Sequence, residues 1–232
     1  MNVKTSVVRG RWCDLDRVAA LATESLAPGA LAAWLVPDAR HRYAVIAAVT
    51  RMWVEHALLF GDVFLLADGT AAAAWFHRYR PLPPPARYAD RLAAMCGVDQ
   101  DRFLRLDRAL AAFRPAEAHN HLALLAVPGR HRTRRAAAVV AGAQRCMDTL
   151  GLPTYADVLA DGDLDLFARQ GYTHRHVLPV DGRVTVHAMW RPAPLGRPHR
   201  PARSASRPPD RTPRPERGSV PALARASVGG AA

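Results

Sequence analysis

Residues 121–127 (HLALLAV) form a mostly apolar run that is followed at once by Pro-Gly at 128–129 and by a helical pattern around 134–150. A short apolar run that ends at Pro and Gly is typical of a strand buried on both faces of a sheet. Gly151 and Pro153 end the helix that follows. The order of strand, loop and helix therefore predicts a buried central strand in an α/β or α+β domain with a mixed sheet.

Strand and helix patterns continue on both sides of this central strand. We expect strands around residues 7–8, 63–67, 71–76, 154–158, 174–179 and 184–190. Hairpin turns are expected at Asp68-Gly69 and Asp181-Gly182. We expect one helix after Asp14 or Asp16 that stops before Pro28, and further helices over residues 39–59, 87–97, 99–113 and 164–169.

The longest of these helices, residues 39–59, is amphipathic. Its apolar residues follow one another at steps of three or four: Tyr43, Ile46, Val49, Trp53 and Ala57. This spacing predicts that one face of the helix is buried. We expect the helices at 87–97 and 99–113 to cover one face of the sheet.

Basic charge is concentrated near the carboxyl end of the chain. The sequence has 32 basic against 20 acidic residues, a net charge of +12, and residues 191–232 hold nine arginines against only Asp210 and Glu216. That segment is rich in proline and lacks an aliphatic pattern, so we expect a folded domain over residues 1–191 and a disordered tail over 192–232. The tail either binds a polyanion, which is the one route to nucleic acid that we expect, or is a solvated extension without a partner.

The cysteines and histidines do not have the spacing of a metal site. Cys13, Cys96 and Cys146 are widely separated, and His174 and His176 have no carboxylate or cysteine at a suitable distance along the chain. We interpret the cysteines as reduced thiols of a cytoplasmic protein. No apolar run reaches the roughly 18 to 20 residues that span a bilayer, and the first residues lack a secretion signal, so we expect no membrane insertion.

Three segments resemble the GNAT superfamily of acyl-CoA-dependent N-acyltransferases. HNHLALLAV followed by PGRHRTRRAA is similar to the family's central strand and pyrophosphate loop, Q/R-x-x-G-x-G/A. DLDLFARQGY is similar to the later segment N-x-x-L-Y-x-x-x-G-F, and VTVHAMWRP fits the closing strand. The likeness covers roughly residues 5–191 and implies an α/β fold with a mixed, mostly antiparallel sheet flanked by helices. It also implies direct transfer of an acetyl group from acetyl-CoA to an amine in a ternary complex.

The resemblance places the acetyl-CoA site at the end of the central strand and the start of the next helix. Unpaired backbone N–H groups at a helix start, helped by the helix dipole, suit a pyrophosphate. The residues implied to contact acetyl-CoA are Leu125, Ala126, Val127, Arg132, Thr133, Arg134, Arg135, Ala136 and Ala137.

Candidate catalytic residues lie on the central strand and on the strand that follows. A base is needed to deliver a neutral amine to the thioester, directly or through water. His119 and His121 begin the central strand, and Asp157 lies on the next strand, where family members often carry glutamate. A backbone N–H near Ala126 or Val127 would stabilise the oxyanion.

Two positions depart from the family pattern. Arg135 stands in place of the middle glycine of the loop, and its guanidinium either contacts phosphate or fills the space that acetyl-CoA needs. Phe167 stands where such enzymes often have a tyrosine that protonates the departing thiolate, and we interpret it as core packing. A second hypothesis is therefore a non-catalytic binding protein on the same fold.

The amine acceptor, a small molecule or a peptide, is expected between the helix 39–59 and the region 77–118. The residues there suggest a partly apolar pocket: Trp53, Phe76, His77 and Tyr79.

Overall fold

A seven-stranded sheet, in the order β1-β2-β3-β4-β5-β7-β6, organises the chain. The computed structural model describes residues 6–130, 132–159, 163–180 and 184–194. The predicted Asp181-Gly182 turn and, of the predicted tail, residues 195–232 lie outside the described residues.

The strands are β1 (Val7–Arg9), β2 (Gly61–Leu66), β3 (Ala72–Arg78), β4 (His119–Ala126), β5 (Thr154–Val158), β6 (Thr173–Val180) and β7 (Val184–Arg191). The α-helices are α1 (Leu15–Leu26), α2 (Ala30–Leu35), α3 (Ala39–Phe60), α4 (Tyr88–Cys96), α5 (Gln100–Phe113), α6 (Arg132–Asp148) and α7 (Leu164–Arg169). Two 3₁₀ turns, η1 (Trp12–Asp14) and η2 (Gly97–Asp99), precede α1 and α5. The predicted helices and strands are present within a few residues of their expected bounds, whereas α2 was not predicted.

Pairing within the sheet is antiparallel except between the two central strands. Strands β4 and β5 are parallel, and α6 makes the crossover between them. All other neighbouring strands are antiparallel. The expected mixed, mostly antiparallel sheet is therefore confirmed.

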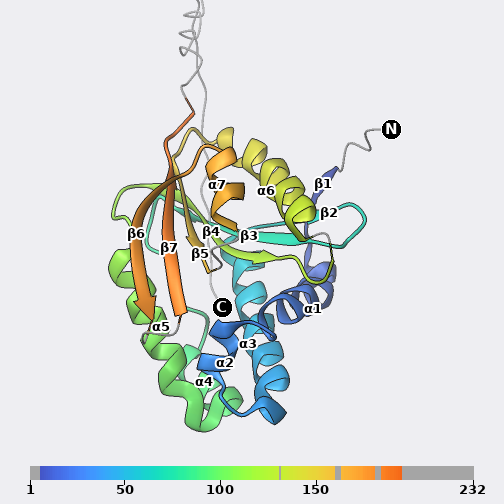
Figure 1. The fold of residues 1–232 in the computed structure, drawn as a ribbon, viewed down its shortest axis with the longest axis vertical. Coiled ribbons are helices and arrows are strands. Elements are labelled where there is room, and N and C mark those ends of the chain that lie inside the picture. Colours follow the sequence, from blue (N-terminus) through green and yellow to red (C-terminus); the bar gives the residue numbers. More distant parts are fainter. Residues whose placement is uncertain (1–5, 131, 160–162, 181–183, 195–232) are drawn as a thin grey trace, which may run out of the picture. The chain divides into compact units, whose positions relative to one another are not determined.

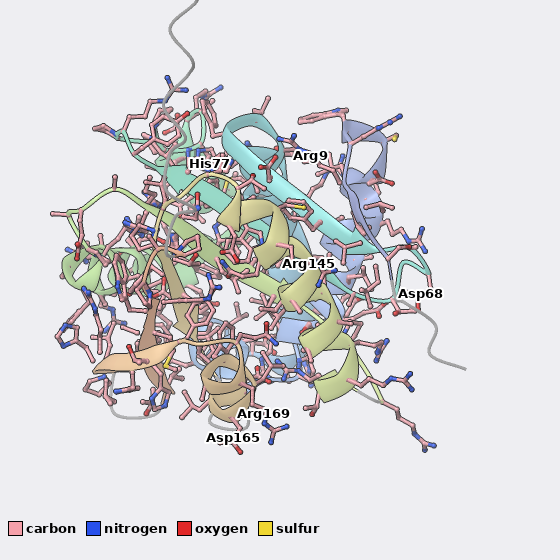
Figure 2. The ribbon with its side chains drawn as sticks, turned by 90° about the horizontal axis from the view of Figure 1, so that it is seen from above. Arg9, Asp68, His77, Arg145, Asp165 and Arg169 are labelled. Atoms are coloured by element: carbon pink, nitrogen blue, oxygen red, sulfur yellow. The ribbon has the colours of Figure 1, made fainter. Side chains whose placement is uncertain are left out.

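Helices α6 and α7 cover one face of the sheet (Figure 1). The apolar side of α6, with Val139, Val140 and Ala143, packs on side chains of the central strands such as Trp75 and Leu122. All five of these residues are at most 2% exposed. Figure 2 looks onto this face, where Arg145 of α6 and Asp165 and Arg169 of α7 are exposed.

The opposite face is covered by α1 and α3, with α2, α4 and α5 beside them (Figure 1). Helix α3 is long and apolar enough to cross a membrane by length and composition alone. Its residues Ile46, Val49 and Met52 are buried in the core beneath the sheet. Tyr43 was expected on the buried face but is 56% exposed, because it lies in the second turn of α3, before the helix reaches the buried cluster that begins at Ile46.

An extra residue in β4 separates the two parallel strands. Ala74 pairs with Leu124 and Trp75 pairs with Leu122, so Ala123 has no partner on β3 and forms a β-bulge. Pairing of β4 with β5 stops at Leu122. From Ala123 onward β4 therefore leaves the edge that faces β5 unpaired.

The start of β2 leaves no room for a side chain. A Cβ added at Gly61 would overlap the backbone carbonyl oxygen of Trp75, whereas a Cβ at Gly29 would meet only the Leu26 oxygen at 3.2 Å. Gly61→Ala must therefore displace β2 from β3, and we expect it to lower the free energy of unfolding by about 3 kcal/mol. Urea titration measures this loss, with Gly29→Ala as the matched control. Equal stability of the two variants would contradict the packing.

Candidate active site

A cavity of about 450 Å³ lies between β4 and β5, where the two strands separate. Its other walls come from the end of α1, the start of α2, and Arg132 and Phe167 on α6 and α7. We call it the splay cavity. The unpaired edge of β4 at this cavity offers backbone N–H and C=O groups to an extended ligand.

A second cavity, of about 410 Å³, lies against α3, β3 and α5 and is closed on one side by prolines 83–85. We call it the side cavity. Most of its lining is apolar, including Trp53 and Phe76. Its polar and charged lining side chains include His56, Arg78, Asp107, Arg114, His121 and Asp157.

The two cavities meet at the tips of β4 and β5. The same residues line both of them at this place: Leu26, Leu31, Ala123, Leu124, Asp157 and Leu159. Asp157 is the charged residue of this shared set. A ligand in one cavity can therefore reach a ligand in the other beside the bulge in β4 and the Asp157 carboxylate.

Asp157 is held by hydrogen bonds to both of its oxygens. His121 Nε2 lies 3.0 Å from Oδ2, and the Tyr155 hydroxyl donates to Oδ1 at 2.7 Å. Arg78 Nε donates to His121 Nδ1 at 3.2 Å, so Nδ1 is the acceptor and Nε2–H is the donor to Asp157. A chain of contacts thus runs from Arg78 through His121 to Asp157.

Burial and hydrogen bonding keep His121 neutral and Asp157 ionised. Burial lowers the pKa of His121 to about 4, and the contact with Asp157 offsets only part of that effect. Burial alone would raise the pKa of Asp157, but hydrogen bonds from His121 and Tyr155 and the charge of Arg114 hold it below its ordinary value. At neutral pH the site therefore contains a carboxylate beside a neutral imidazole.

His119, the third candidate catalytic residue, does not line either cavity. Its side chain packs against Tyr155 and Trp190, and its Nδ1 lies 2.7 Å from the carbonyl oxygen of Glu117. Burial lowers its pKa. The structure thus places Asp157 and His121 together at the side cavity and leaves His119 in the core behind them.

The residues predicted to contact acetyl-CoA take four positions. Leu125 and Arg132 line the splay cavity. Thr133 and Arg134 are exposed in the first turn of α6. Four pack inside: Ala126, Val127 and Ala136 are buried, and Ala137 is partly buried against the same core as Ala136. The ninth, Arg135, lies against the loop and is described below.

Two contacts tie the elements around the splay cavity together. The Val127 N–H, one of the predicted oxyanion donors, donates to the Ser25 hydroxyl of α1 at 3.3 Å. The Arg132 guanidinium forms a two-pronged ion pair with Asp163, with 2.7 Å between Nη2 and Oδ2. Both partners of this pair line the splay cavity, so the pair joins α6 to the start of α7 across its wall.

Arg135 braces the loop that connects β4 to α6. Its guanidinium donates to the carbonyl oxygens of Pro128 and Arg130 within the loop, and to that of Thr70 in the β2–β3 turn at 3.2 Å. Arg135 does not contribute to the lining of the splay cavity. The side chain therefore uses its donors on backbone carbonyl groups, in a position that neither of the two predicted alternatives described.

Phe167 is 2% exposed and packs edge-on against Tyr172, with 5.2 Å between the ring centroids. It also lines the splay cavity. Phe167 thus belongs to the core and to the cavity wall at the same time.

The predicted acceptor pocket is present only in part. Trp53 and Phe76 line the side cavity, but Tyr79 is 58% exposed. His77, labelled in Figure 2, lies on the α6 face, because side chains alternate along β3. Its Nε2 is 3.0 Å from Asp62 Oδ2, and Arg9 pairs with the same carboxylate.

Sequence reasoning missed Tyr155, Arg78 and Arg114 at this site. Tyr155 precedes Asp157 by two residues and Arg78 follows Phe76 by two, so strand alternation alone places each pair on one face. Arg114 follows α5 and reaches the side cavity through the tertiary fold, which no local pattern indicates.

The low pKa of His121 predicts a stability that falls in mild acid. The unfolded chain takes up a proton at His121 near pH 6.5, whereas the folded chain does so only near 4. The unfolded state therefore binds more protons in this window, and folding should lose up to about 3 kcal/mol as the pH falls through it. Urea titrations from pH 7 to 4.5 should show a smaller loss in His121→Gln. The control is His41→Gln, at an exposed position of α3, and a loss as large in His121→Gln as in the parent would contradict the assignment.

Comparisons with known proteins extend this description. No protein-family model matches the sequence, and no curated protein sequence matches it. Solved structures do match: "histone acetyltransferase HPA2 and related acetyltransferase" from Corynebacterium glutamicum is 20% identical over 83% of this chain and 98% of its own, with a TM-score of 0.63.

Two further structures are similar. Arylalkylamine N-acetyltransferase 2 from Aedes aegypti is 10% identical over 81% of this chain and 98% of its own, with a TM-score of 0.54. An agmatine N-acetyltransferase in its apo form is 18% identical over 80% of this chain and 98% of its own, with a TM-score of 0.52. At such identities the likeness establishes the arrangement of the backbone and no more. The chain therefore has the fold of the GNAT acetyltransferases.

Proposed function

We propose that this protein is an acetyl-CoA-dependent N-acetyltransferase that transfers the acetyl group directly to an amine. The observation that carries the proposal is the meeting of the splay cavity and the side cavity at Asp157 and the bulge of β4. Two substrates that enter from the two cavities would react at that junction, which is the geometry that direct transfer needs.

The described residues fit acetyl-CoA. The unpaired edge of β4 suits the amide groups of its extended arm, and the loop after β4 leads to the amino end of the long helix α6. Gly129 in this loop has a φ of +70°, a conformation that favours glycine. The exposed Thr133 and Arg134 add a hydroxyl donor and a positive charge at the same helix end, whereas the charge of Arg132 is paired with Asp163. When bound, acetyl-CoA supplies the thioester carbonyl that the amine attacks.

Asp157 is the group that would receive the amine. Most amines arrive as ammonium ions, and a carboxylate at the junction of the cavities holds that charge where the reaction occurs. The amine must then lose a proton, which Asp157 accepts directly or through water. His121 is a positioning residue in this scheme: as a neutral donor, fixed from behind by Arg78, it orients the carboxylate.

Departure of the thiolate proceeds without a protein acid at position 167. Phe167 has no proton to give, and it lines the splay cavity as an apolar wall. Because a thiolate is a fair leaving group, solvent can protonate it after it departs. We place the reaction in the cytoplasm, as expected for a chain with three unpaired cysteines.

The alternative of a non-catalytic protein rested on Arg135 and Phe167. Its main argument loses force because Arg135 is folded against the loop carbonyl groups instead of standing in the splay cavity. Phenylalanine at position 167 means that a tyrosine acid is absent there, but the junction of the two cavities at Asp157 does not depend on that residue.

Asp157→Asn tests the proposed reaction. The amide keeps the shape of the side chain but neither holds an ammonium ion nor accepts its proton. We expect kcat/KM for a good amine to fall by about 10²- to 10⁴-fold. Release of free thiol from acetyl-CoA measures the rate.

The matched control is Asp165→Asn, on the exposed face of α7 (Figure 2), which should retain the parent rate. Calorimetric titration should show that Asp157→Asn still binds acetyl-CoA. An Asp157→Asn enzyme as fast as the parent would remove Asp157 from the mechanism.

Arg135→Gln tests how the loop is held. Glutamine cannot reach the three carbonyl groups, so the loop loosens and affinity for acetyl-CoA should fall by about tenfold. Calorimetry on the full chain measures this change. Arg145→Gln, an exposed position on the same helix (Figure 2), should bind like the parent. Tighter binding by Arg135→Gln would instead mean that the arginine obstructs the site.

A further inference from the structure

Two arginines converge on the side cavity from different elements. Arg78 ends β3 and Arg114 follows α5, and both line the cavity. Burial and then the positive charge of Arg114 lower the pKa of Arg78 to about 10. Two like charges thus lie close enough to oppose each other beside an apolar cavity.

Neither guanidinium has an anionic partner among the described residues. Arg78 donates to the neutral His121 and stacks over Phe76, with 5.7 Å from Cζ to the ring centroid. Arg114 Nε is buried and has no hydrogen-bond partner in the part of the chain that the structure describes. A buried donor without a partner costs free energy that a suitable acceptor would recover.

Several other partly buried arginines of this domain have an anionic partner. Arg132 pairs with Asp163, and Arg191 pairs with Asp148 at 2.6 Å. Arg42 and Arg135 lack an anionic partner too, but their guanidinium groups donate to backbone carbonyl oxygens and neither lines the side cavity. Arg78 and Arg114 differ from them because both line the cavity. Their position on a cavity wall indicates that the missing anion comes from a ligand.

The two carboxylates that line the side cavity with these arginines are already engaged. Asp157 accepts hydrogen bonds from His121 and Tyr155. Asp107 accepts one from the Tyr88 hydroxyl at 2.6 Å, and burial raises the pKa of Asp107. Neither carboxylate forms an ion pair with Arg78 or Arg114, so the guanidinium donors remain for a bound anion.

The spacing of the charges suits a small zwitterion. One imidazole ring, that of His121, separates the Arg78 guanidinium from the Asp157 carboxylate through contacts of 3.2 and 3.0 Å. An α-amino acid carries its amine and its carboxylate at a similar separation once a hydrogen bond is added at each end. The remaining lining, such as Trp53, Phe76 and Leu110, is apolar.

We propose that the acceptor is an amino acid with an apolar side chain, whose carboxylate binds Arg78 and Arg114 and whose amine lies at Asp157. This inference rests on the proposed acetyl transfer and names its substrate class. Two arginines on one cavity wall suit a carboxylate, because guanidinium groups bind it through forked hydrogen bonds. A cavity of about 410 Å³ accommodates one such molecule.

The first test compares acceptors that differ only in the carboxylate. Phenylalanine is paired with phenethylamine, and leucine with 3-methylbutylamine, in assays of thiol release from acetyl-CoA by the full chain. We expect kcat/KM to be at least about tenfold higher for each amino acid, as a charge-assisted hydrogen bond gives. Equal or better rates with the plain amines would overturn the proposal.

Arg114→Gln identifies the group that recognises the carboxylate. The variant should lose most of the preference for the amino acids, measured as the ratio of kcat/KM for each amino acid to kcat/KM for its plain amine in the same variant. The control is Arg108→Gln, on the exposed side of α5, the helix that Arg114 follows, and it should keep the preference. Arg114→Lys keeps the charge without the fork, so it should retain part of the preference and serves if the glutamine variant does not fold. A preference that persists unchanged in these Arg114 variants would overturn the assignment.

Direct binding separates this inference from the proposed function. N-acetylphenylalanine, a product analogue, should raise the melting temperature of the parent more than N-acetylphenethylamine does, and Arg114→Gln should abolish the difference. Transfer to plain amines without any carboxylate preference would overturn this inference alone. Absence of both acetyl-CoA binding and transfer would overturn the proposed function, and the melting experiment would still decide whether the carboxylate site exists.

Discussion

The extra residue in β4 is the constraint on which the rest of the site depends. Because Ala123 has no partner on β3, the strand beyond it turns away from β5, and pairing between the two stops at Leu122. A regular parallel pair would place backbone hydrogen bonds where the splay cavity now lies. The bulge also alters the alternation of side chains, so that Ala123 and Leu124 both face the side cavity. One inserted residue therefore creates both the cavity and its opening to a second one.

The polar groups behind this opening act as one unit. His121 is buried and neutral, and both of its ring nitrogens are used, one by Arg78 and one by Asp157. That arrangement makes His121 a poor base, because it could take up a proton only by losing the hydrogen bond from Arg78. It makes Asp157 a well-held carboxylate, which the Tyr155 hydroxyl fixes from the other side. The histidine that looked like a base in the sequence is thus better suited to orienting the Asp157 carboxylate.

Local patterns in the sequence predicted the fold well and the site only in part. The Asp-Gly turn between β2 and β3 and the apolar run of β4 depend on neighbours along the chain, so residue types alone identify them. The resemblance pointed to Asp157, and the alternation of side chains along a strand puts Tyr155, two residues earlier, on the same face. The bulge at Ala123 and the approach of Arg114 to Arg78 depend on pairing and packing between distant segments, which no window of sequence contains. His77 shows the same limit, because its face of the sheet is set by the register of β3.

Arg135 shows why a lost motif residue does not equal a lost site. Glycine in the middle of the family loop allows close approach of the backbone to phosphate, and an arginine there looks like an obstruction. In this fold the position lies on the inner side of the loop, so the side chain reaches the carbonyl groups of Pro128, Arg130 and Thr70. The substitution thus exchanges conformational freedom for a brace that ties the loop to the β2–β3 turn. Such a loop is held in shape before any ligand arrives, which reduces the ordering cost of binding.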